Sequence, residues 1–438
     1  MNIKINIIIF IILSSSLIFS QENIEIKDTT KTEKEFDYTW AQGNDRKHSH
    51  VLESKYFSGT ITFDANYNYS FNNPIDHTNT GSTATFRSNE LNIPYIEGGG
   101  EFHDKNNHAK IILQFGTRVT AIPRNDLTPL RGQYDLYTAM RNIAEAYAGH
   151  HFNWWKGVNL DIGIFRSYVG LCSANNFENW NYQSSYTSDN TPWFFTGARM
   201  QAQVTSKLKV ELWLISGWQT YAMFNNQPGF GFQIQYRPRE WLSLVTNEYV
   251  GWDTPNSSSR IRVHSDNSIT LRYRNRPGRS IPKAAFSFTG DLGFENGDGV
   301  TAFGGSTGPA QNFASFMVYN RIWLGKKQRF AWTNGGGYMN NPGRYLALMP
   351  TGNAIVTQNP GEQLEGWDFT SGIQFMPTEY MTWGLEFVTR HMNTPYFSGH
   401  GGVTSPNGWN APIGNPTGFV ADLVRDENRI IASVIFRF

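Results

Sequence analysis

The sequence predicts an all-β protein, a transmembrane antiparallel up-and-down β-barrel of about 16 strands. Two observations lead to this fold class. The two faces of a strand formed by the closing residues 429–438 would differ in polarity, and segments of alternating polarity recur from Phe57 onward. One face of the closing stretch carries both of its charges, Arg429 and Arg437. Its other face is wholly apolar, formed by Phe438, Phe436, Val434, Ala432 and Ile430. A period of two suits a strand between lipid and water, and we expect Phe436 and Phe438 to close the barrel.

The composition agrees with a barrel and limits the other classes. Hydrophobic residues make up 39% of the chain and aromatic residues 15%, which suits strands with one watery face and aromatic girdles at the interfaces. The formal net charge of +1 argues against a nucleic-acid surface. The single cysteine, Cys172, excludes a disulfide framework. After residue 20, no stretch is long and apolar enough for a membrane-spanning helix.

Three regions follow one another along the chain. Residues 1–20, with Lys4 before the apolar run 5–13, have the layout of a secretory signal peptide, and we expect cleavage after Ser20. Residues 21–55 are polar and charged, which predicts a periplasmic N-terminal segment that is disordered or loosely docked. Residues 56–438 are expected to form one unit, the barrel, because no Pro/Ser-rich linker divides them.

Strands are expected wherever polarity alternates over about ten residues. In chain order they lie near 57–70, 91–103, 108–120, 142–152, 157–166, 193–204, 208–218, 230–237, 240–252, 260–274, 282–294, 312–324, 328–340, 365–376, 380–391 and 429–438. Short connections, such as 104–107, 205–207 and 377–379, alternate with long ones, such as 121–141, 167–192, 341–364 and 392–428. A soluble domain could end on the same kind of strand, but short periplasmic turns and long outer loops are typical of an outer-membrane barrel.

The direction of individual side chains can also be read from the alternation. Leu385 is expected to face lipid, with Glu386 and Arg390 facing the lumen. A Lys or Arg on the lipid face costs about 2–4 kcal/mol at the midplane, so the alternation is a constraint. In the strand near 240–252 the alternation slips ahead of Glu248, and we expect a β-bulge there.

A row of bases on the strand near 260–274 is the strongest chemical feature. Five basic residues of this strand are expected to project into the lumen: Arg260, Arg262, His264, Arg272 and Arg274. The other charged residues predicted to line the pore are Arg118, Arg199, Lys209, Arg237 and Arg390, with the acids Asp161, Glu211 and Glu386. An excess of bases in a narrow channel favours anions. The alternative is that facing bases and acids neutralise one another and stiffen the wall.

The long loop 167–192 is aromatic and polar, and it is the candidate for constricting the lumen. Its candidate constriction residues are Phe177, Glu178, Trp180 and Tyr182. Folded inward, the loop would narrow a lumen that is otherwise wide enough for an aqueous channel. The alternative is a cap that packs on the neighbouring outer loops.

The histidines do not form a recognisable catalytic or metal-binding pattern. No His-Glu-x-x-His motif is present, and the adjacent His150 and His151 would point to opposite faces of a strand. An outer-membrane hydrolase would need a serine beside a histidine such as His150, and no convincing partner is found. We therefore expect a protein that is not an enzyme and has no cofactor and no metal site.

Short motifs follow one another across the middle of the chain, at Gly163–Gly170, Asn179–Tyr182, Gly197–Arg199, Leu214–Gln219, Asn247–Gly251 and His264–Asn267. In this order and spacing the sequence resembles the OmpL-like beta-barrel porin family of Gram-negative bacteria, from about residue 93 to the C-terminus. The resemblance implies an outer-membrane barrel with porin-like passage of small solutes. It supplies no catalytic residues.

These observations predict an outer-membrane porin, a passive diffusion channel for small hydrophilic solutes or ions with a weak anion preference. We expect it in the outer membrane of a Gram-negative bacterium after cleavage of the signal peptide. Its expected partners are outer-membrane lipid and the solutes, without nucleic acid, and a homo-oligomer is left open. The alternative is a non-conducting barrel that acts as a binding, adhesion or secretion-associated scaffold. Its lumen would be plugged by residues 22–55 or by the loop 392–428.

Overall fold

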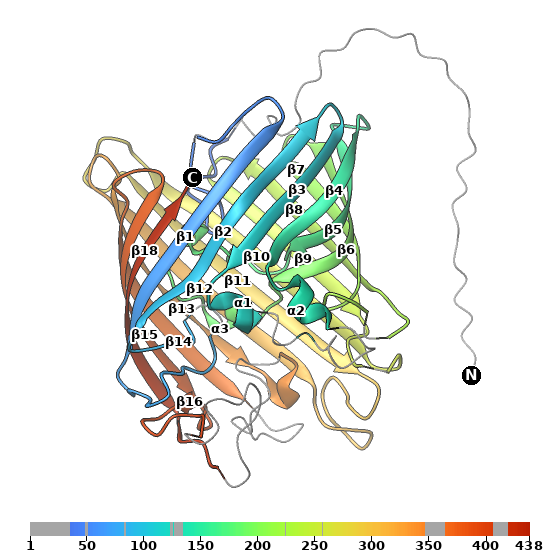
Figure 1. Cartoon of the computed structure of the whole chain (residues 1–438), viewed down its shortest axis with the longest axis vertical. Coiled ribbons are helices and arrows are strands. Elements are labelled where there is room, and N and C mark those ends of the chain that lie inside the picture. Colours follow the sequence, from blue (N-terminus) through green and yellow to red (C-terminus); the bar gives the residue numbers. More distant parts are fainter. Residues whose placement is uncertain are drawn as a thin grey trace.

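The wall of the molecule is a closed antiparallel β-barrel (Figure 1). The computed structural model describes residues 36–48, 51–82, 85–122, 126, 135–223, 225–255, 257–346, 364–405 and 419–438. The predicted signal peptide, residues 1–20, lies outside the described residues.

Sixteen strands form the wall, so the predicted fold class and strand number are confirmed. They are β1 (Phe57–Ser70), β2 (Leu91–Asp104), β3 (Asn107–Phe115), β4 (Ile143–Phe152), β5 (Val158–Arg166), β6 (Phe194–Thr205), β7 (Leu208–Ile215), β8 (Gly229–Arg239), β9 (Leu242–Gly251), β10 (Ile261–Asn275), β11 (Lys283–Asn296), β12 (Asn312–Leu324), β13 (Phe330–Asn340), β14 (Glu365–Phe375), β15 (Met381–Met392) and β18 (Asp426–Arg437). Each strand pairs with the next one in this order, and β18 pairs with β1.

The remaining elements are short and lie in the connections. They are α1 (Arg118–Ala121), α2 (Leu136–Met140), α3 (Tyr186–Asp189), the 3-10 turns η4 (Asn176–Glu178) and η5 (Pro342–Arg344), and the two-stranded sheet of β16 (Phe397–Ser398) and β17 (Leu423–Val424). Among the described residues, no helix is both long and apolar enough to cross a membrane.

The last strand closes the ring as its alternation predicts. Phe436 stands opposite Phe63 in the register of β18 with β1, and the backbone N–H of Phe438 donates to the carbonyl of Ile61 at 2.9 Å. Pairing of both neighbours satisfies the backbone groups that a free edge would leave without partners in lipid. Inward-facing Ile431 and Ile435 are at most 1% exposed, whereas outward-facing Ile430 is 40% exposed.

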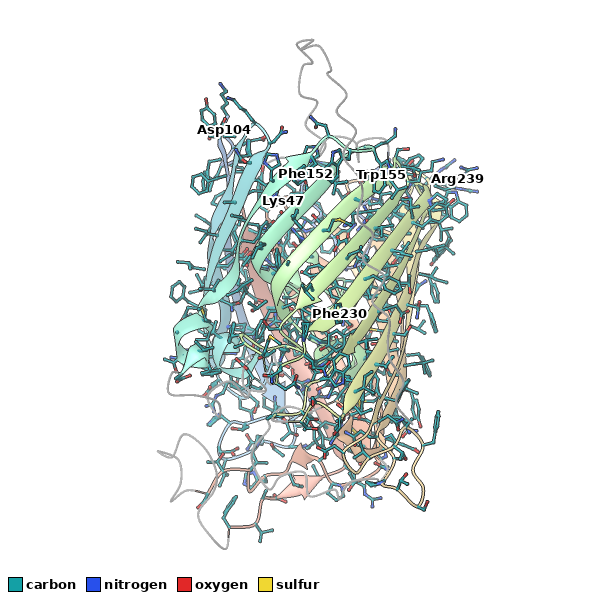
Figure 2. The ribbon with its side chains drawn as sticks, turned by 90° about the vertical axis from the view of Figure 1, so that its right-hand side faces the viewer. Lys47, Asp104, Phe152, Trp155, Phe230 and Arg239 are labelled. Atoms are coloured by element: carbon teal, nitrogen blue, oxygen red, sulfur yellow. The ribbon has the colours of Figure 1, made fainter. Side chains whose placement is uncertain are left out.

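The two ends of the barrel differ in the length of their connections. Strands joined by tight connections, such as β2–β3 and β8–β9, meet at the end that holds the C-terminus (Figure 1). We call this the turn end, and Asp104, Trp155 and Arg239 mark it in Figure 2. The long connections, including 116–142, 167–193 and 393–425, start from the opposite end, which we call the loop end.

The inward and outward faces of the strands agree with the predicted alternation. Leu385 is 59% exposed on the outer face of β15, whereas Glu386 and Arg390 are 4% and 2% exposed on its inner face. Outward-facing Ile162 is 66% exposed beside the fully buried Asp161. A period of two therefore places apolar residues toward lipid and charges toward the lumen.

The bulge predicted ahead of Glu248 is not where the irregularity lies. β9 pairs with β10 without a break from Leu242 to Gly251, and the register shift falls between Tyr236 and Arg239 of β8. Because the alternation continues through β9, Glu248 faces outward between the inward-facing Asn247 and Tyr249, which are 2% and 1% exposed. A carboxylate therefore lies on the outer wall.

Candidate functional site

The connection between β5 and β6, residues 167–193, lies inside the barrel, and we call it the lumen loop. Its candidate constriction residues Phe177, Trp180 and Tyr182 are only 3–4% exposed. Phe177 and Tyr182 pack against the inward-facing Ile431 and Ile435, which explains why β18 carries apolar side chains on its lumen face as well. The loop thus takes the inward arrangement rather than forming a cap.

Polar side chains attach the lumen loop to β1 and β2. Nδ2 of Asn175 donates to Oγ1 of Thr62 at 3.2 Å and to Oε1 of Glu97 at 3.0 Å. The hydroxyl of Tyr182 donates to Oδ1 of Asp64 at 2.7 Å. Burial raises the pKa of Tyr182 well above its usual value, so its phenol stays neutral and remains a donor.

Further bonds attach the lumen loop to β13, β14 and β15. Glu386 accepts the backbone N–H of Tyr182 at 2.6 Å, and Asp368 accepts the hydroxyl of Ser185 at 2.8 Å. A Cβ at Gly337 would lie 2.5 Å from Oγ of Ser185, so a glycine of β13 makes room for the loop. The part of the loop from Asn175 onward is therefore bound to this half of the wall, whereas Tyr168 and Gly170 at its start bond to β8, β9 and β10.

Residues 36–48, which we call the N-terminal segment, lie across the turn end of the lumen. The hydroxyl of Tyr38 donates to the carbonyl of Arg239 at 2.6 Å, and Nη2 of Arg46 donates to the carbonyl of Met381 at 2.8 Å. Trp40 is 1% exposed within a cluster that includes Trp180. These residues are docked because their aromatic side chains find an apolar site inside the barrel, and the prediction for the rest of 21–55 stays a prediction.

A cavity of about 330 Å³ remains between the lumen loop and the other half of the wall. Strands β4 to β10, which face the viewer in Figure 2, supply its wall. The first residues of the lumen loop and the N-terminal segment complete the lining. Its charged lining residues are Arg166, Arg199, Lys209, Arg237, Glu145 and Glu211. Four basic and two acidic side chains therefore line this cavity.

Ion pairs and rings hold the charged residues of the cavity in place. Arg199 donates to Oδ2 of Asp161 through Nη2 at 2.7 Å, and its Cζ lies 4.7 Å from the ring centroid of Phe165. Nζ of Lys209 lies 2.9 Å from Oε1 of Glu211. The side chains of Arg199 and Lys209 are 14% and 26% exposed, so both heads border the cavity while they remain paired.

The predicted row of bases on β10 is broken up by ion pairs within the wall. Arg260 and Arg262 both pair with Glu295 of β11, and His264 lies 3.4 Å from Asp291 of the same strand. The β10 residues that line the cavity are instead Ser268 and Thr270.

The bases of that row nearer the turn end, Arg272 and Arg274, also lie away from the cavity. Nη2 of Arg272 donates to Glu240 at 2.6 Å, and its guanidinium lies 5.2 Å from the ring centroid of Trp40. Nε of Arg274 donates to the carbonyl of Ile281 at 2.7 Å near the turn end, after a register shift in β10. A continuous ladder is therefore not formed, because acids on β11 and near the turn end pair with these bases.

Four other residues predicted to line the pore support the wall and the lumen loop. Arg118 is 1% exposed and donates to the carbonyl of Ala174 in the lumen loop. Arg390 is 2% exposed, with Nη2 2.6 Å from Oε2 of Glu427. Asp161 is fully buried beside Arg199, and Glu386 holds the backbone of the lumen loop. Of the predicted lining residues, Arg199, Lys209, Arg237 and Glu211 do border the cavity, and their role in conduction stays a prediction.

Sequence reasoning missed several residues that line the cavity. Arg166 ends β5 at the start of the lumen loop, and Gln201, Gln233 and Gln235 lie on the inner faces of β6 and β8. A glutamine at every second position of a strand was an available signal for a polar lumen face. Nothing in the local pattern of residues 36–48 indicates that they enter the lumen.

One sequence pattern has the form Gly-x-Ser-x-Gly, at Gly304–Gly308. It lies in the exposed loop between β11 and β12, where Gly305 and Gly308 form an isolated bridge. A nucleophile elbow requires a sharp turn from a strand into a helix, so this pattern does not have the setting that such chemistry needs.

The family model described as "Putative beta-barrel porin-2, OmpL-like" matches residues 56–438. No curated protein matches the chain.

Several solved structures share the fold at very low sequence identity. The anion-selective porin from Comamonas acidovorans is 9% identical with a TM-score of 0.51, and the match covers 87% of this chain and 99% of that one. The outer membrane channel DcaP of Acinetobacter baumannii is 8% identical with a TM-score of 0.51, and the match covers 89% and 100%. The trimer form of OmpT from Vibrio cholerae is 8% identical with a TM-score of 0.50, and the match covers 87% and 99%. At these identities the likeness extends to the fold alone.

Proposed function

The chain belongs to the OmpL-like beta-barrel porin-2 family, and on this premise we propose that it is a passive diffusion channel for small hydrophilic solutes and ions. The observation that carries the proposal is the polar cavity of about 330 Å³ beside the lumen loop. Most of the loop is bound to β1, β2 and β13 to β15, and solutes pass along the other side, where β4 to β10 line the cavity. Passage down a gradient requires no cofactor.

The charges around the cavity support a weak preference for anions. Four bases and two acids line it, and outside the lining Asp161 and Glu97 offset part of the charge of Arg199 and Arg166. Wall charge of one sign raises the local concentration of the opposite ion where low-dielectric walls enclose a narrow space. Because most of these bases are already paired, we expect a modest preference rather than exclusion of cations.

The location of the channel follows from the same proposal. We place it in the outer membrane of a Gram-negative bacterium, with the signal peptide 1–20 removed, the turn end toward the periplasm and the outward apolar residues in contact with lipid. Nucleic acid is not among its proposed partners.

Swelling of proteoliposomes in sugars of increasing size tests the proposal. We expect the folded protein to admit small sugars fastest. Gln201→Trp, which adds bulk on the inner face of β6, should slow swelling, whereas Val204→Trp on the outer face of β6 should not. Folded protein that causes no swelling with any sugar would overturn the proposal.

The N-terminal segment favours a second candidate function, a barrel that does not conduct while this segment is docked. It lies across the turn end with Trp40 buried, where it obstructs part of the lumen. A variant that lacks residues 36–48 separates the two candidates. If swelling occurs only in that variant, the full chain is an occluded barrel; if both proteins cause swelling, the diffusion channel holds.

A further inference from the structure

Four polar side chains form a patch on the outer surface of the barrel, which we call the outer polar patch. They are Thr246 and Glu248 of β9, and Ser265 and Asn267 of β10. Their neighbours along each strand point inward: Asn247, Tyr249, His264 and Asp266 are all at most 2% exposed. The register places Glu248 opposite Ser265 and Thr246 opposite Asn267, so the four residues form one square across the two strands.

Hydrogen bonds connect the members of the patch. Ser265 donates to Oε1 of Glu248 at 2.7 Å, and Thr246 donates to Oδ1 of Asn267 at 2.6 Å. Nδ2 of Asn267 donates to Oγ of Ser265 at 2.9 Å. The patch is therefore a defined cluster rather than four separate side chains that extend toward water.

The surroundings of the outer polar patch are apolar. On the neighbouring β8, Phe230 and Phe232 are 50% and 39% exposed on the outer surface, and Phe230 is labelled in Figure 2. On the other side, β11 presents Phe288 and Leu292, which are 38% and 64% exposed. Ile269, which is 44% exposed, continues the apolar surface on the turn-end side of Asn267. The patch thus lies within the surface that faces hydrocarbon in a barrel of this kind.

Lipid does not satisfy such a group of residues. A carboxylate and a carboxamide lose their hydration in hydrocarbon, and ionisable residues at such positions usually meet a partner. Within the described residues, the patch uses Oε1 of Glu248 and one of the two N–H groups of Asn267. Oε2 of Glu248 and the second N–H of Asn267 can therefore serve a partner as acceptor and donor.

An acceptor and a donor side by side on one patch make the patch complementary to itself. In an isologous contact a two-fold axis relates the two copies, so every contact forms twice. Asn267 of the first copy then reaches Glu248 of the second, and Asn267 of the second reaches Glu248 of the first. We propose that the outer polar patch is a contact surface for a second copy of this chain within the membrane. The flanking phenylalanines and Leu292 form the apolar rim of that contact.

Cysteine cross-linking in membranes tests the proposal directly. The native cysteine, Cys172, is 8% exposed inside the lumen loop, so an introduced cysteine is the accessible one. Leu292→Cys, in the apolar rim, keeps Asn267 and Glu248 intact and should give a product of twice the chain mass with a short bifunctional maleimide. Ile96→Cys, on the outer face of β2 across the barrel, is the matched control and should stay monomeric.

A second variant separates a specific contact from chance collisions. Glu248→Leu in the Leu292→Cys background removes the acceptor without exposing a new charge to lipid, and we expect at least a fivefold loss of the cross-linked product. Folding of each variant is checked by heat-modifiable migration on gels. The proposal is overturned if folded Leu292→Cys gives no dimer, if its cross-link is to a different protein, or if Glu248→Leu leaves the yield unchanged.

Discussion

Nε1 of Trp180 in the lumen loop donates a hydrogen bond to the backbone oxygen of Trp40 in the N-terminal segment, at 3.1 Å. A second hydrogen bond joins the same two segments. Here the backbone of the lumen loop meets a side chain of the N-terminal segment, because the backbone N–H of Trp180 donates to Oε1 of Gln42 at 2.8 Å. The backbone N–H of Gly43 also donates to the carbonyl of Glu178 at 3.2 Å. The two segments therefore occupy the lumen as one interlocked unit, although 140 positions separate the two tryptophans.

Docking of the N-terminal segment depends on the indole of Trp40. Trp40→Ala removes a side chain that is 1% exposed and should weaken docking by about 3–5 kcal/mol, the usual range for a buried Trp or Phe. Since Nε2 of Gln42 donates to Sγ of Cys172 at 3.1 Å, release of the segment uncovers the thiol. The rate of maleimide labelling of Cys172 should therefore rise.

Trp155→Ala is the matched control for this measurement. Trp155 lies in the β4–β5 connection at the turn end and is 77% exposed, so its loss should leave the labelling rate unchanged. Equal labelling rates in wild type and Trp40→Ala would show that Trp40 does not hold the segment in place.

The labelling of Cys172 should also depend on pH in a particular direction. Burial raises the pKa of its thiol, so the neutral form persists to higher pH than in an unfolded chain. Because the thiolate is the reactive form, the pH profile of labelling in the folded protein should be displaced toward alkaline pH relative to the protein in urea. Identical profiles in the two states would contradict a buried thiol.

A buried ion pair near the loop end should contribute strongly to stability. Arg390 and Glu427 are 2% and 1% exposed at their side chains, with Nη2 and Oε2 2.6 Å apart. Arg390→Ala removes one of the two buried guanidinium partners of Glu427, since Nε of Arg429 also lies 3.1 Å from Oε2. We expect a loss in the free energy of unfolding at the lower end of about 3–5 kcal/mol. Urea titration of the refolded protein in lipid measures this loss.

The exposed pair of Arg87 and Glu90 provides the comparison. Its side chains are 29% and 37% exposed, so solvent screens the interaction. Arg87→Ala should cost about 0–1 kcal/mol. Equal losses for Arg87→Ala and Arg390→Ala would mean that burial does not set the strength of the Arg390 pair.

The wall of the barrel could be predicted because its rules are local. Lipid on one side and water on the other impose a period of two, so Leu385, Glu386 and the closing Phe436 were assigned to the correct faces. Glu248 is the informative exception. A lipid-facing carboxylate contradicts the rule, and the sequence interpretation placed a bulge there to avoid it, whereas β9 continues in register.

The interior could not be predicted to the same extent, because it depends on contacts between distant residues. Asn175 donates a hydrogen bond to Glu97, and Tyr182 donates one to Asp64. No local sequence pattern predicts either contact. The bases of β10 lie inside the barrel, but their partners on β11, such as Glu295, decide whether their charge acts on a solute. The position of the cavity follows from these pairings.

Single-channel recording across a KCl gradient tests the central claim most directly. We predict steady conductance for the wild type and a reversal potential that indicates a modest preference for chloride. Lys209→Gln removes one of the four bases that line the cavity, and it should shift the reversal potential toward that of potassium. Arg274→Gln removes the same charge beside Ile281 near the turn end and should leave the reversal potential unchanged. Folded protein that gives a silent bilayer, or a preference for potassium in the wild type, would contradict the account.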